Sequence, residues 1–325
     1  MNITPQQNTE IQTPPKLTII VISYNTRAMT LKCIETVFAE TRDTSFELII
    51  LDNASTDGSA EALMDRYSDK ATVICSAENL GFAAANNVVA KQASGEFLLL
   101  LNPDTEVLDG AIDKLVAFSE SRPEARIWGG GTVFPDKRLN PASSWGRMTY
   151  WSLISTLSGL SSVFKNTSIF NVEGMGGWDR QGDKYVDIIT GCFLLIQKNF
   201  WEELGGFDKD FFMYGEEADL CLRATKLGAR PLATSRAIII HHGGASETVQ
   251  SDKMVRLLNA KVKLIQKHFS PGSGRFAVYL LTLWPLSRYL AHSILAAAGW
   301  KSSQLPASVW KNIWGRRTTW RNPAG

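Results

Sequence analysis

Four short apolar runs in the first hundred residues constrain the fold of this chain more than any other feature. They are residues 17–23, 46–52, 71–75 and 96–101. Runs of Val, Ile and Leu without polar alternation are typical of strands that are covered on both faces of a parallel sheet. Segments with helical periodicity lie between them, such as residues 31–38 and 82–93. This alternation predicts an α/β fold with a mostly parallel central sheet and helices on both faces.

Polar residues follow three of these runs directly. They are Ser23-Tyr24-Asn25, Asp52-Asn53 and Asn102-Pro103-Asp104. Asp and Asn are ordinary turn residues, so any one of the three groups has a purely structural explanation. Ligands of open α/β sheets, however, bind outside the carboxyl ends of the strands, where all three groups fall together. The pattern therefore favours a binding crevice at this edge of the sheet.

The chain divides into three expected parts. Residues 1–15 are rich in Gln, Thr and Pro, with no basic start and no apolar run, which indicates a disordered lead-in and not a signal peptide. Residues 16–248 carry the α/β pattern. Residues 249–325 are expected to form a helical extension. Within the α/β part, residues 128–183 are less regular, and their apolar stretch 151–164 is either an acceptor-side loop or a helix packed on the core. Residues 186–196 read as a further strand, interrupted at Thr190-Gly191.

Charge is strongly polarised along the sequence. From Lys253 onward there are twelve Lys and Arg and no acidic residue, whereas residues 1–252 contain all 32 Asp and Glu. Such a basic segment needs an anionic partner: lipid headgroups, nucleic acid or a polyphosphate. No nucleic-acid-binding motif accompanies the charge, so nucleic acid is not the expected partner.

The basic segment is also rich in tryptophan and contains an interrupted apolar stretch. Residues 276–300 are broken by Pro285, Arg288 and His292, so they are not expected to span a membrane. Five of the ten tryptophans lie in residues 284–320. Trp with Lys and Arg is typical of a segment that lies on anionic lipid. We therefore expect residues 253–325 to bind a membrane surface, against the alternative of a helical cap with a solvated basic face.

The four cysteines, Cys33, Cys75, Cys192 and Cys221, are widely spaced and lie among apolar residues. None of the spacings is that of a zinc or redox motif. They are expected to be buried free thiols, which suits a reducing cytoplasm.

The polar segments, taken in order, resemble glycosyltransferase family 2, the inverting enzymes with a GT-A fold, and especially its bacterial rhamnosyltransferase-like branch. The segments that carry the resemblance are Val-Ile-Ser-Tyr-Asn25, Asp-Asn-Ala-Ser-Thr-Asp-Gly-Ser59, Asn79-Leu-Gly-Phe-Ala-Ala-Ala-Asn86, Leu-Asn-Pro-Asp104, Thr190-Gly-Cys-Phe, Gly-Gly-Phe-Asp208, Glu216-Glu217-Ala-Asp219-Leu-Cys-Leu-Arg223 and His241-x-Gly-Gly-x-Ser246. Each is weak alone, but their order and spacing make the resemblance specific. It covers roughly three quarters of the chain, from Leu17 to Ser246.

The resemblance implies a donor site for a nucleoside diphosphate sugar. Asp104 is then the metal-facing carboxylate of the family's Asp-x-Asp motif, whose first Asp is replaced here by Asn102. His241, with His242 as the alternative, resembles the imidazole that reaches the same metal or the diphosphate. The implied cofactor is Mn²⁺ or Mg²⁺, because oxygen ligands suit both ions and an imidazole favours Mn²⁺.

The nucleoside side of the donor site is implied in the same way. Asp52 resembles the Asp that accepts a hydrogen bond from the pyrimidine ring. The other implied donor-binding residues are Ser23, Tyr24, Asn25, Asn79 and Asn86. Asp57 is either a further donor contact or a helix N-cap.

An inverting transferase needs a general base that deprotonates the acceptor hydroxyl. Glu217 matches the second position of the family's acidic pair, where Asp is more usual, and Glu216 is the alternative. Acids in the first turn of a helix are also favoured by its dipole, and Asp219 and Arg223 form an (i, i+4) pair. That structural explanation covers Glu216 and Asp219 but not two adjacent acids, so Glu217 is the expected base.

The implied activity is transfer of a sugar, first of all L-rhamnose from dTDP-rhamnose, to a glycan or polyprenyl-linked acceptor during synthesis of bacterial surface polysaccharide. The enzyme is expected to work in the cytoplasm, peripherally on the inner face of the membrane. Other donors (UDP-galactose, UDP-GlcNAc, GDP-mannose) and a non-catalytic nucleotide-sugar-binding relative remain alternatives. A nucleotidyltransferase is not favoured, because no glycine-rich phosphate loop follows the first strand. The sequence does not indicate an oligomeric state.

Overall fold

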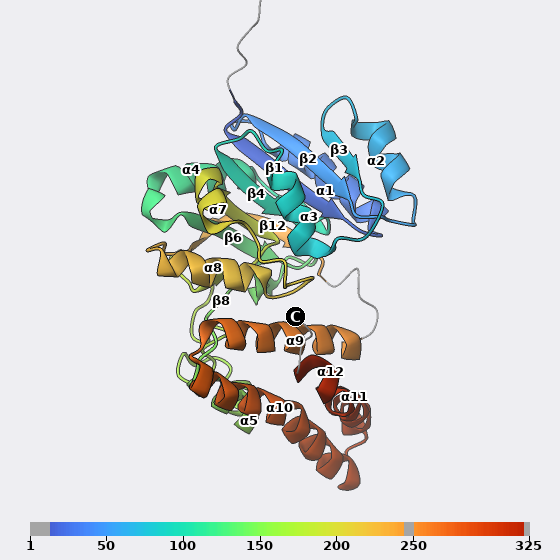
Figure 1. Cartoon of the computed structure of the whole chain (residues 1–325), viewed down its shortest axis with the longest axis vertical. Helices are drawn as coiled ribbons and strands as arrows, with labels where there is room; N and C mark the ends of the chain where they lie inside the picture. Colours follow the sequence, from blue (N-terminus) through green and yellow to red (C-terminus); the bar gives the residue numbers. More distant parts are fainter. Residues whose placement is uncertain (1–13, 244–249, 322–325) are drawn as a thin grey trace, which may run out of the picture.

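The computed structural model of the chain describes residues 14–243 and 250–321. Most of the expected lead-in, Ser246 of the last motif and the expected domain boundary at residues 248–249 lie outside the described residues. In the described part, strands alternate with helices up to residue 243, and only helical elements follow (Figure 1).

The strands are β1 (Leu17–Ser23), β2 (Phe46–Asp52), β3 (Thr72–Cys75), β4 (Phe97–Leu101), β5 (Thr105–Val107), β6 (Ile127–Val133), β7 (Leu139–Asn140), β8 (Ser144–Trp145), β9 (Asp183–Tyr185), β10 (Ile188–Ile189), β11 (Phe193–Gln197) and β12 (Leu232–His241). The α-helices are α1 (Arg27–Glu40), α2 (Ser59–Tyr67), α3 (Gly81–Ala90), α4 (Ala111–Ser121), α5 (Tyr150–Ser158), α6 (Leu160–Val163), α7 (Lys198–Leu204), α8 (Glu216–Lys226), α9 (Gln250–His268), α10 (Pro271–Ala297), α11 (Gln304–Gly315) and α12 (Arg317–Arg321). Short 3₁₀ helices occupy Pro123–Ala125, Pro141–Ser143 and Lys301–Ser303.

The central sheet has the strand order β3-β2-β1-β4-β11-β6-β12-β5, with β7 beside β6 and β9 beside β12. Strands β3, β2, β1 and β4 are parallel, as are β6 and β12, whereas β11 is antiparallel to both β4 and β6. The predicted α/β class with a mostly parallel sheet is therefore confirmed. Ser23 pairs with Asp52 in the register of β1 and β2, so the polar strand ends do meet at one edge.

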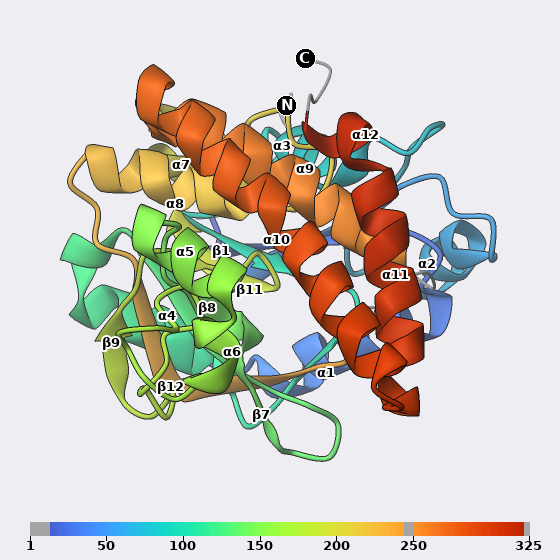
Figure 2. The same cartoon turned by 90° about the horizontal axis from the view of Figure 1, so that it is seen from below.

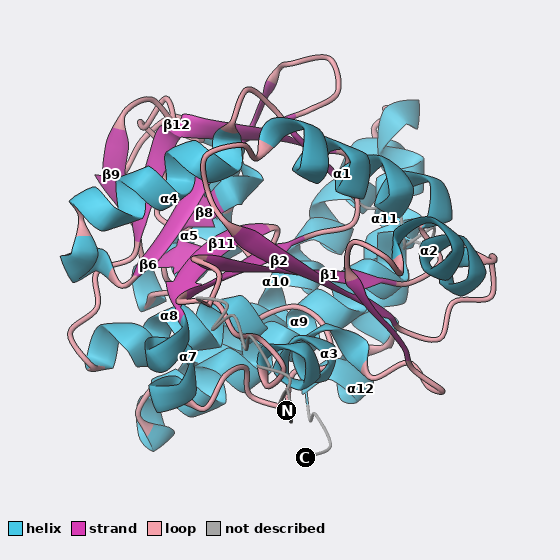
Figure 3. Cartoon of the chain, turned by 90° about the horizontal axis from the view of Figure 1, so that it is seen from above, coloured by secondary structure: helices cyan, strands magenta, loops and turns pink. Residues whose placement is uncertain are grey.

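Each face of the sheet is covered by helices because the strand side chains alternate between two apolar clusters. Ile20 and Ile22 of β1 pack on the face that carries α3, α7 and α8. Ile19 and Val21 of the same strand pack on the opposite face, against α1, α2 and α4. Figure 3 shows the sheet between these two layers of helices.

The C-terminal helices α9 to α12 have a core of their own. Leu258, Ile265, Leu281 and Trp320 are buried in it, together with Leu153 of α5. The segment 151–164 is thus mainly helical, and it packs on the C-terminal helices. In Figure 1, α9 lies along α8, with α10 on its far side. No helix within residues 14–243 and 250–321 is long and apolar enough to cross a membrane.

Three local expectations were wrong. Cys75, at the end of edge strand β3, is exposed, whereas the other three free cysteines are buried as predicted. The interrupted strand expected at residues 186–196 is two separate strands in different sheets; they divide at the expected Thr190-Gly191 interruption, where Thr190 donates from Oγ1 to the carbonyl of Ala142 at 2.6 Å. Residues 129–131 belong to β6 and are not irregular. Glycine is required there, since a Cβ at Gly130 would lie 2.4 Å from the Phe193 ring.

Candidate active site

Asp52 ends β2 with one carboxylate oxygen unused. Its Oδ2 accepts a hydrogen bond from the backbone N–H of Ser55 at 3.0 Å. Its Oδ1 is buried and has no hydrogen-bond partner in the described part of the chain. A buried acceptor without a donor is costly, so this oxygen is suited to a ligand N–H.

The residues after β1 are mostly engaged in building the loop. Ser23 Oγ lies 3.0 Å from Thr30 Oγ1 in a buried pair. Asn25 has a φ of 52°, and its Oδ1 accepts from the backbone N–H of Thr56 at 2.8 Å. Tyr24 is exposed, and its hydroxyl group has no hydrogen-bond partner among residues 14–243 and 250–321. Of the three, Tyr24 is the side chain left available to a ligand.

Asn79 and Asn86 also have structural partners. Asn79 Oδ1 accepts from Asn53 Nδ2 at 3.0 Å and from the backbone N–H of Gly81 at 2.9 Å. Asn86 Nδ2 donates to the carbonyl of Phe82, one turn earlier in α3, at 2.9 Å. Asn79 therefore shapes the loop between β3 and α3, whereas the hydrogen bond of Asn86 lies within α3.

Asp57 is not the N-cap of α2, which is Gly58, but its carboxylate binds the first backbone N–H of two helices. Its Oδ2 accepts from the backbone N–H of Arg27 at 3.0 Å, at the first residue of α1. Its Oδ1 accepts from Ser59 N–H at 3.1 Å, at the start of α2. These hydrogen bonds lower the pKa of Asp57, although burial opposes them.

Asp104 lies buried where β4, β5 and β12 meet. Its Oδ2 accepts from the backbone N–H of Gly243 at 3.1 Å, and its Oδ1 lies 3.4 Å from Nε2 of His241. Burial favours the neutral acid, but the hydrogen bond and charge of His241 outweigh it and lower the pKa of Asp104. The structure thus brings Asp104 and His241 together, from segments 137 residues apart.

The two adjacent histidines have different neighbours. Burial lowers the pKa of His241, but the hydrogen bonds with Asp104 and Cys192 outweigh it and raise this pKa to about 10. Nδ1 of His241 is buried without a hydrogen-bond partner among the described residues. His242 turns to the other side, and its Nε2 lies 2.8 Å from Oε1 of Glu106 in β5. His241 and not His242 is therefore the imidazole beside Asp104.

A divalent cation fits this corner with few protein ligands. Asp104 offers carboxylate oxygens, His241 an imidazole nitrogen, and Asn102 a buried Oδ1 that lacks a partner in the described part of the chain. Oxygen and imidazole donors suit Mn²⁺. Across residues 14–243 and 250–321, no three His, Cys, Asp or Glu side chains cluster as a complete metal site. The remaining ligands of such an ion would come from the donor and from water.

Glu216 and Glu217 begin α8, after Gly215 with a φ of 89°. Burial and the charge of Glu217 raise the pKa of Glu216 well above its ordinary value. Burial also raises the pKa of Glu217, although a hydrogen bond from Glu216 and the helix backbone oppose the rise. In each side chain Oε2 lacks a hydrogen-bond partner within the described residues.

Of the two glutamates, Glu217 and not Glu216 lines the cavity beside α8. Glu217 lines a cavity of about 740 Å³, whereas Glu216 is buried behind it. The other walls come from residues 145–150, from α9 and from the first half of α10. Outside α8, its lining residues were not predicted from the sequence, because they come from segments that carry none of the quoted motifs.

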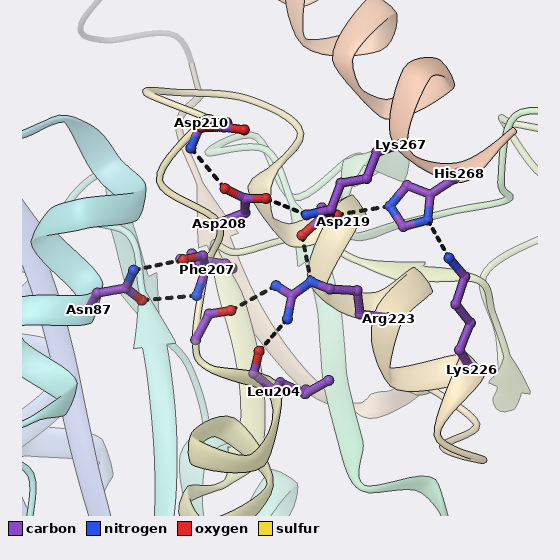
Figure 4. A network of polar contacts seen from close by, with 11 residues as sticks. Asn87, Leu204, Phe207, Asp208, Asp210, Asp219, Arg223, Lys226, Lys267 and His268 are labelled. Atoms are coloured by element: carbon purple, nitrogen blue, oxygen red, sulfur yellow. Dashed lines mark hydrogen bonds and ion pairs between the residues drawn. The ribbon is translucent and has the colours of Figure 1, made fainter. Parts of the chain in front are cut away.

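A buried polar network fixes α8 against α9 (Figure 4). Asp219 is completely buried and accepts from Arg223 Nε at 2.7 Å, Lys267 Nζ at 2.8 Å and His268 Nε2 at 2.9 Å. Lys267 also pairs with Asp208. The helix that carries Glu217 is therefore held by residues of the C-terminal helices.

Comparison with known families identifies the class of this chain. The model of the family described as "Glycosyl transferase family 2" matches residues 18–202. The match includes β1 to β4, Asp52 and Asp104, and it covers more than half of the chain. The chain belongs to glycosyltransferase family 2.

Individual relatives agree with this assignment. The chain is 31% identical over 240 residues to the O-antigen biosynthesis protein RfbC of Myxococcus xanthus, covering 71% of this chain and 18% of that protein. It is 26% identical over 217 residues to the N-acetylglucosaminyl-diphospho-decaprenol L-rhamnosyltransferase of Mycobacterium tuberculosis, covering 60% of this chain and 66% of that protein. It is 25% identical over 224 residues to the rhamnosyltransferase WbbL of Escherichia coli, covering 65% of this chain and 78% of that protein. The chain thus spans less than two thirds of the length of the first two relatives.

Among solved structures, the chain resembles the mannosyltransferase PcManGT from Pyrobaculum calidifontis, determined in complex with GDP-Man and Mn²⁺. The TM-score is 0.57 at 17% identity, over 95% of this chain and 88% of that one. This likeness supports the GT-A fold.

Proposed function

We propose that this protein is an inverting glycosyltransferase that moves a sugar from a nucleoside diphosphate to a hydroxyl group of a glycan or lipid-linked saccharide. One observation carries the proposal: in a family 2 chain, Asp104 and His241 meet at 3.4 Å at the edge of the sheet where the family binds its donor. Glu217 supplies a carboxylate with a raised pKa at a cavity, as a general base requires.

The donor side divides into two parts. Asp104 and His241, with Asn102, would hold a divalent cation, which when bound neutralises charge on the leaving diphosphate. The unused Oδ1 of Asp52 accepts an N–H of the nucleotide base. The exposed ring of Tyr24 covers the base from the side of the solvent.

Glu217 acts on the acceptor side. Its carboxylate takes the proton of the acceptor hydroxyl as the oxygen attacks the sugar carbon from the face opposite the diphosphate. Glu216, buried behind it with the higher pKa, stays protonated and donates a hydrogen bond to Glu217. That bond keeps Glu217 as the member of the pair that ionises.

L-Rhamnose from dTDP-rhamnose is the first donor to test. Two of the similar proteins are named as rhamnosyltransferases, and one of these names contains a lipid-linked acceptor, N-acetylglucosaminyl-diphospho-decaprenol. A solved structure with a similar fold is a mannosyltransferase in complex with GDP-Man, so GDP-mannose belongs in the same panel, together with UDP-galactose and UDP-GlcNAc.

The test is hydrolysis and transfer from this panel of nucleotide sugars, with and without Mn²⁺. Wild type is expected to turn over one donor in a metal-dependent manner, and Asp104→Ala is expected to lose that turnover. If wild type and Asp104→Ala behave alike with every donor, the catalytic proposal fails. Donor binding without turnover would instead support a non-catalytic relative, the alternative that the missing Asp at Asn102 leaves open.

A membrane surface is the second partner that we propose. Large apolar side chains are exposed on two segments: Val163 and Ile169 at α6 and after it, and Ile294, Trp300 and Leu305 on α10 and at α11. We call these five residues the apolar face. Helix α10 contacts α5, since Arg288 donates to the carbonyl of Thr156 at 2.6 Å, and Figure 2 shows α5, α6, α10 and α11 on one side of the molecule. Exposed Lys165, Lys301 and Lys311 accompany the face, so an anionic bilayer matches both its charge and its apolar surface.

A further inference from the structure

Three unpartnered polar atoms converge on the cavity beside α8. They are Oε2 of Glu217, the hydroxyl of Tyr150 and Nε1 of Trp284, each buried without a hydrogen-bond partner among residues 14–243 and 250–321. All three residues line the same 740 Å³ cavity, although they come from α8, α5 and α10. Buried polar atoms are nearly always paired in native proteins, so three orphans in one cavity indicate a missing polar ligand.

The chemistry of the three atoms restricts that ligand. The Glu217 carboxylate accepts hydrogen bonds, the indole N–H of Trp284 only donates, and the hydroxyl of Tyr150 does either. A purely apolar ligand would leave all three unpaired. An isolated phosphate would place its charge beside the carboxylate of Glu217. A ligand with several neutral hydroxyl groups satisfies all three atoms at once.

The walls between these atoms are aromatic and aliphatic. The ring of Tyr150 lies edge-on to that of Phe269, with centroids 5.2 Å apart, and Trp145, Phe269 and Trp284 line the same cavity. Lys261, which also lines the cavity, is already paired with Glu173. Pockets of this size that combine aromatic walls with a few convergent polar groups are typical of small-ligand sites. A sugar ring presents hydroxyl groups at its edge and C–H groups on its faces, which matches this lining.

We propose that this cavity is a saccharide-binding site for the acceptor, in which Tyr150 and Trp284 bind acceptor hydroxyl groups and present one of them to Glu217. The inference rests on the proposed transferase function, and it adds that α9 and α10 are part of the active site. Acceptor choice is then determined by the C-terminal helices together with residues 145–150, and not by the edge of the sheet that binds the donor.

The experiment measures binding in the absence of donor and metal, by isothermal titration calorimetry with three amphiphiles below their micelle concentrations. The probes are octyl β-D-glucopyranoside, octyl N-acetyl-β-D-glucosaminide and, as a control without a sugar, tetraethylene glycol monooctyl ether. At least one glycoside is expected to bind with one-to-one stoichiometry, and more tightly than the ether. Equal affinity for the ether and the glycosides would overturn the proposal, because the cavity would then be a lipid pocket; so would absence of binding by both glycosides.

Two conservative variants assign the binding to this cavity. Tyr150→Phe and Trp284→Phe each remove one orphan polar atom and keep an aromatic ring. Since neither atom has a partner in the described structure, neither variant is expected to lower the thermal unfolding temperature. Each is expected to weaken glycoside binding roughly fivefold to tenfold, which corresponds to one lost hydrogen bond. Tyr185→Phe, an exposed tyrosine outside the cavity, is the matched control.

The same variants separate this inference from the transferase proposal. If the protein transfers sugar but Tyr150→Phe and Trp284→Phe leave the acceptor KM unchanged, the cavity is not the acceptor site and the transferase function stands. If the glycosides bind in the cavity but no donor is ever turned over, the transferase function fails and a saccharide-binding site remains.

Discussion

Oδ1 of Asp219 in α8 accepts a hydrogen bond from Nε2 of His268 in α9 at 2.9 Å, and this bond joins the helix that carries Glu217 to the C-terminal helices. Arg223 extends the contact to the loop after α7, where it donates to the carbonyls of Leu204 at 2.6 Å and Gly206 at 2.7 Å. Asn87 of α3 reaches the same loop through the backbone of Phe207, as Figure 4 shows. The position of Glu217, two residues before Asp219, thus depends on contacts from both parts of the chain.

Asp219→Asn is expected to destabilise the protein by about 3–5 kcal/mol at pH 7, because it removes the completely buried carboxylate that pairs with Arg223 and Lys267. The measurement is urea unfolding, followed by circular dichroism. The matched control is Asp109→Asn, whose ion pair with Lys114 lies at the surface and should contribute little. If Asp219→Asn lowers the free energy of unfolding as little as Asp109→Asn does, Asp219 does not stabilise the contact between α8 and α9.

The effect of Asp219 should also depend on pH in a defined direction. Burial would raise its pKa, but the hydrogen bonds from His268, Lys267 and Arg223 outweigh this and hold the pKa far below the ordinary value. A group whose pKa is lower in the folded state stabilises the fold above its unfolded pKa, near 4, and loses that contribution as the pH falls further. The difference in unfolding free energy between wild type and Asp219→Asn should therefore shrink below about pH 4.

The adjacent histidines provide a matched pair for the metal proposal. His241→Gln is expected to weaken Mn²⁺-dependent donor binding at least about tenfold, because it removes the imidazole beside Asp104. His242→Gln breaks only the contact with Glu106 and should leave the Mn²⁺ dependence unchanged. Donor titrations with and without Mn²⁺ measure both. The reverse order of effects would assign the metal to His242.

The glutamate pair gives a second matched comparison. Glu217→Gln is expected to lower kcat about 10²- to 10⁴-fold without weakening donor binding, because it removes the general base. Glu216→Gln should retain most activity, since its amide still donates a hydrogen bond to Glu217. In wild type, kcat should rise with pH through a pKa above that of an ordinary glutamate, because burial raises the pKa of Glu217. Loss of transfer in Glu216→Gln alone would move the base to Glu216.

Membrane binding can be tested by sedimentation with vesicles. Wild type is expected to bind vesicles that contain phosphatidylglycerol and not vesicles of phosphatidylcholine alone, and binding should weaken as salt is added. Replacing both Lys301 and Lys311 by Glu, next to the apolar face, should weaken binding at least about tenfold. The double variant Lys70→Glu/Lys91→Glu changes the same charge on exposed residues of the α/β part and serves as the control. Equal loss in both variants would mean that only net charge matters.

The central sheet could be predicted because a strand that is buried on both faces of a parallel sheet is a continuous apolar run in the sequence. Such a run can be recognised without knowing which strands lie beside it. Strands β1 and β2 begin and end where the sequence indicated. The direction of β11 could not be predicted, because a strand buried on both faces has the same composition whichever way it runs. Strand β6 was not predicted because glycine has a low strand propensity. Glycine is required at position 130 only because the Phe193 ring packs against the backbone there, which the sequence does not indicate.

The polar strand ends of the proposed donor site could also be predicted from the sequence. Asp52, Asn102 and Asp104 lie at strand ends, where topology alone brings residues together. The cavity could not be predicted from the sequence, because Tyr150, Glu217 and Trp284 become neighbours only through the packing of α5, α8 and α10. The same holds for the choice between His241 and His242, which depends on how β12 pairs with β5.

The proposed donor site and the cavity are formed by different parts of the sequence, which has a consequence for how the specificity of such chains can change. The proposed donor site is formed almost entirely by residues before 105, whereas α9 and α10 supply much of the cavity wall. If both proposals hold, exchange of the stretch 250–284 would alter the surface presented to the acceptor and would replace none of the proposed donor-binding residues. A lineage could thus acquire a new glycosidic product by replacing a pair of helices, while inheriting its nucleotide chemistry unchanged.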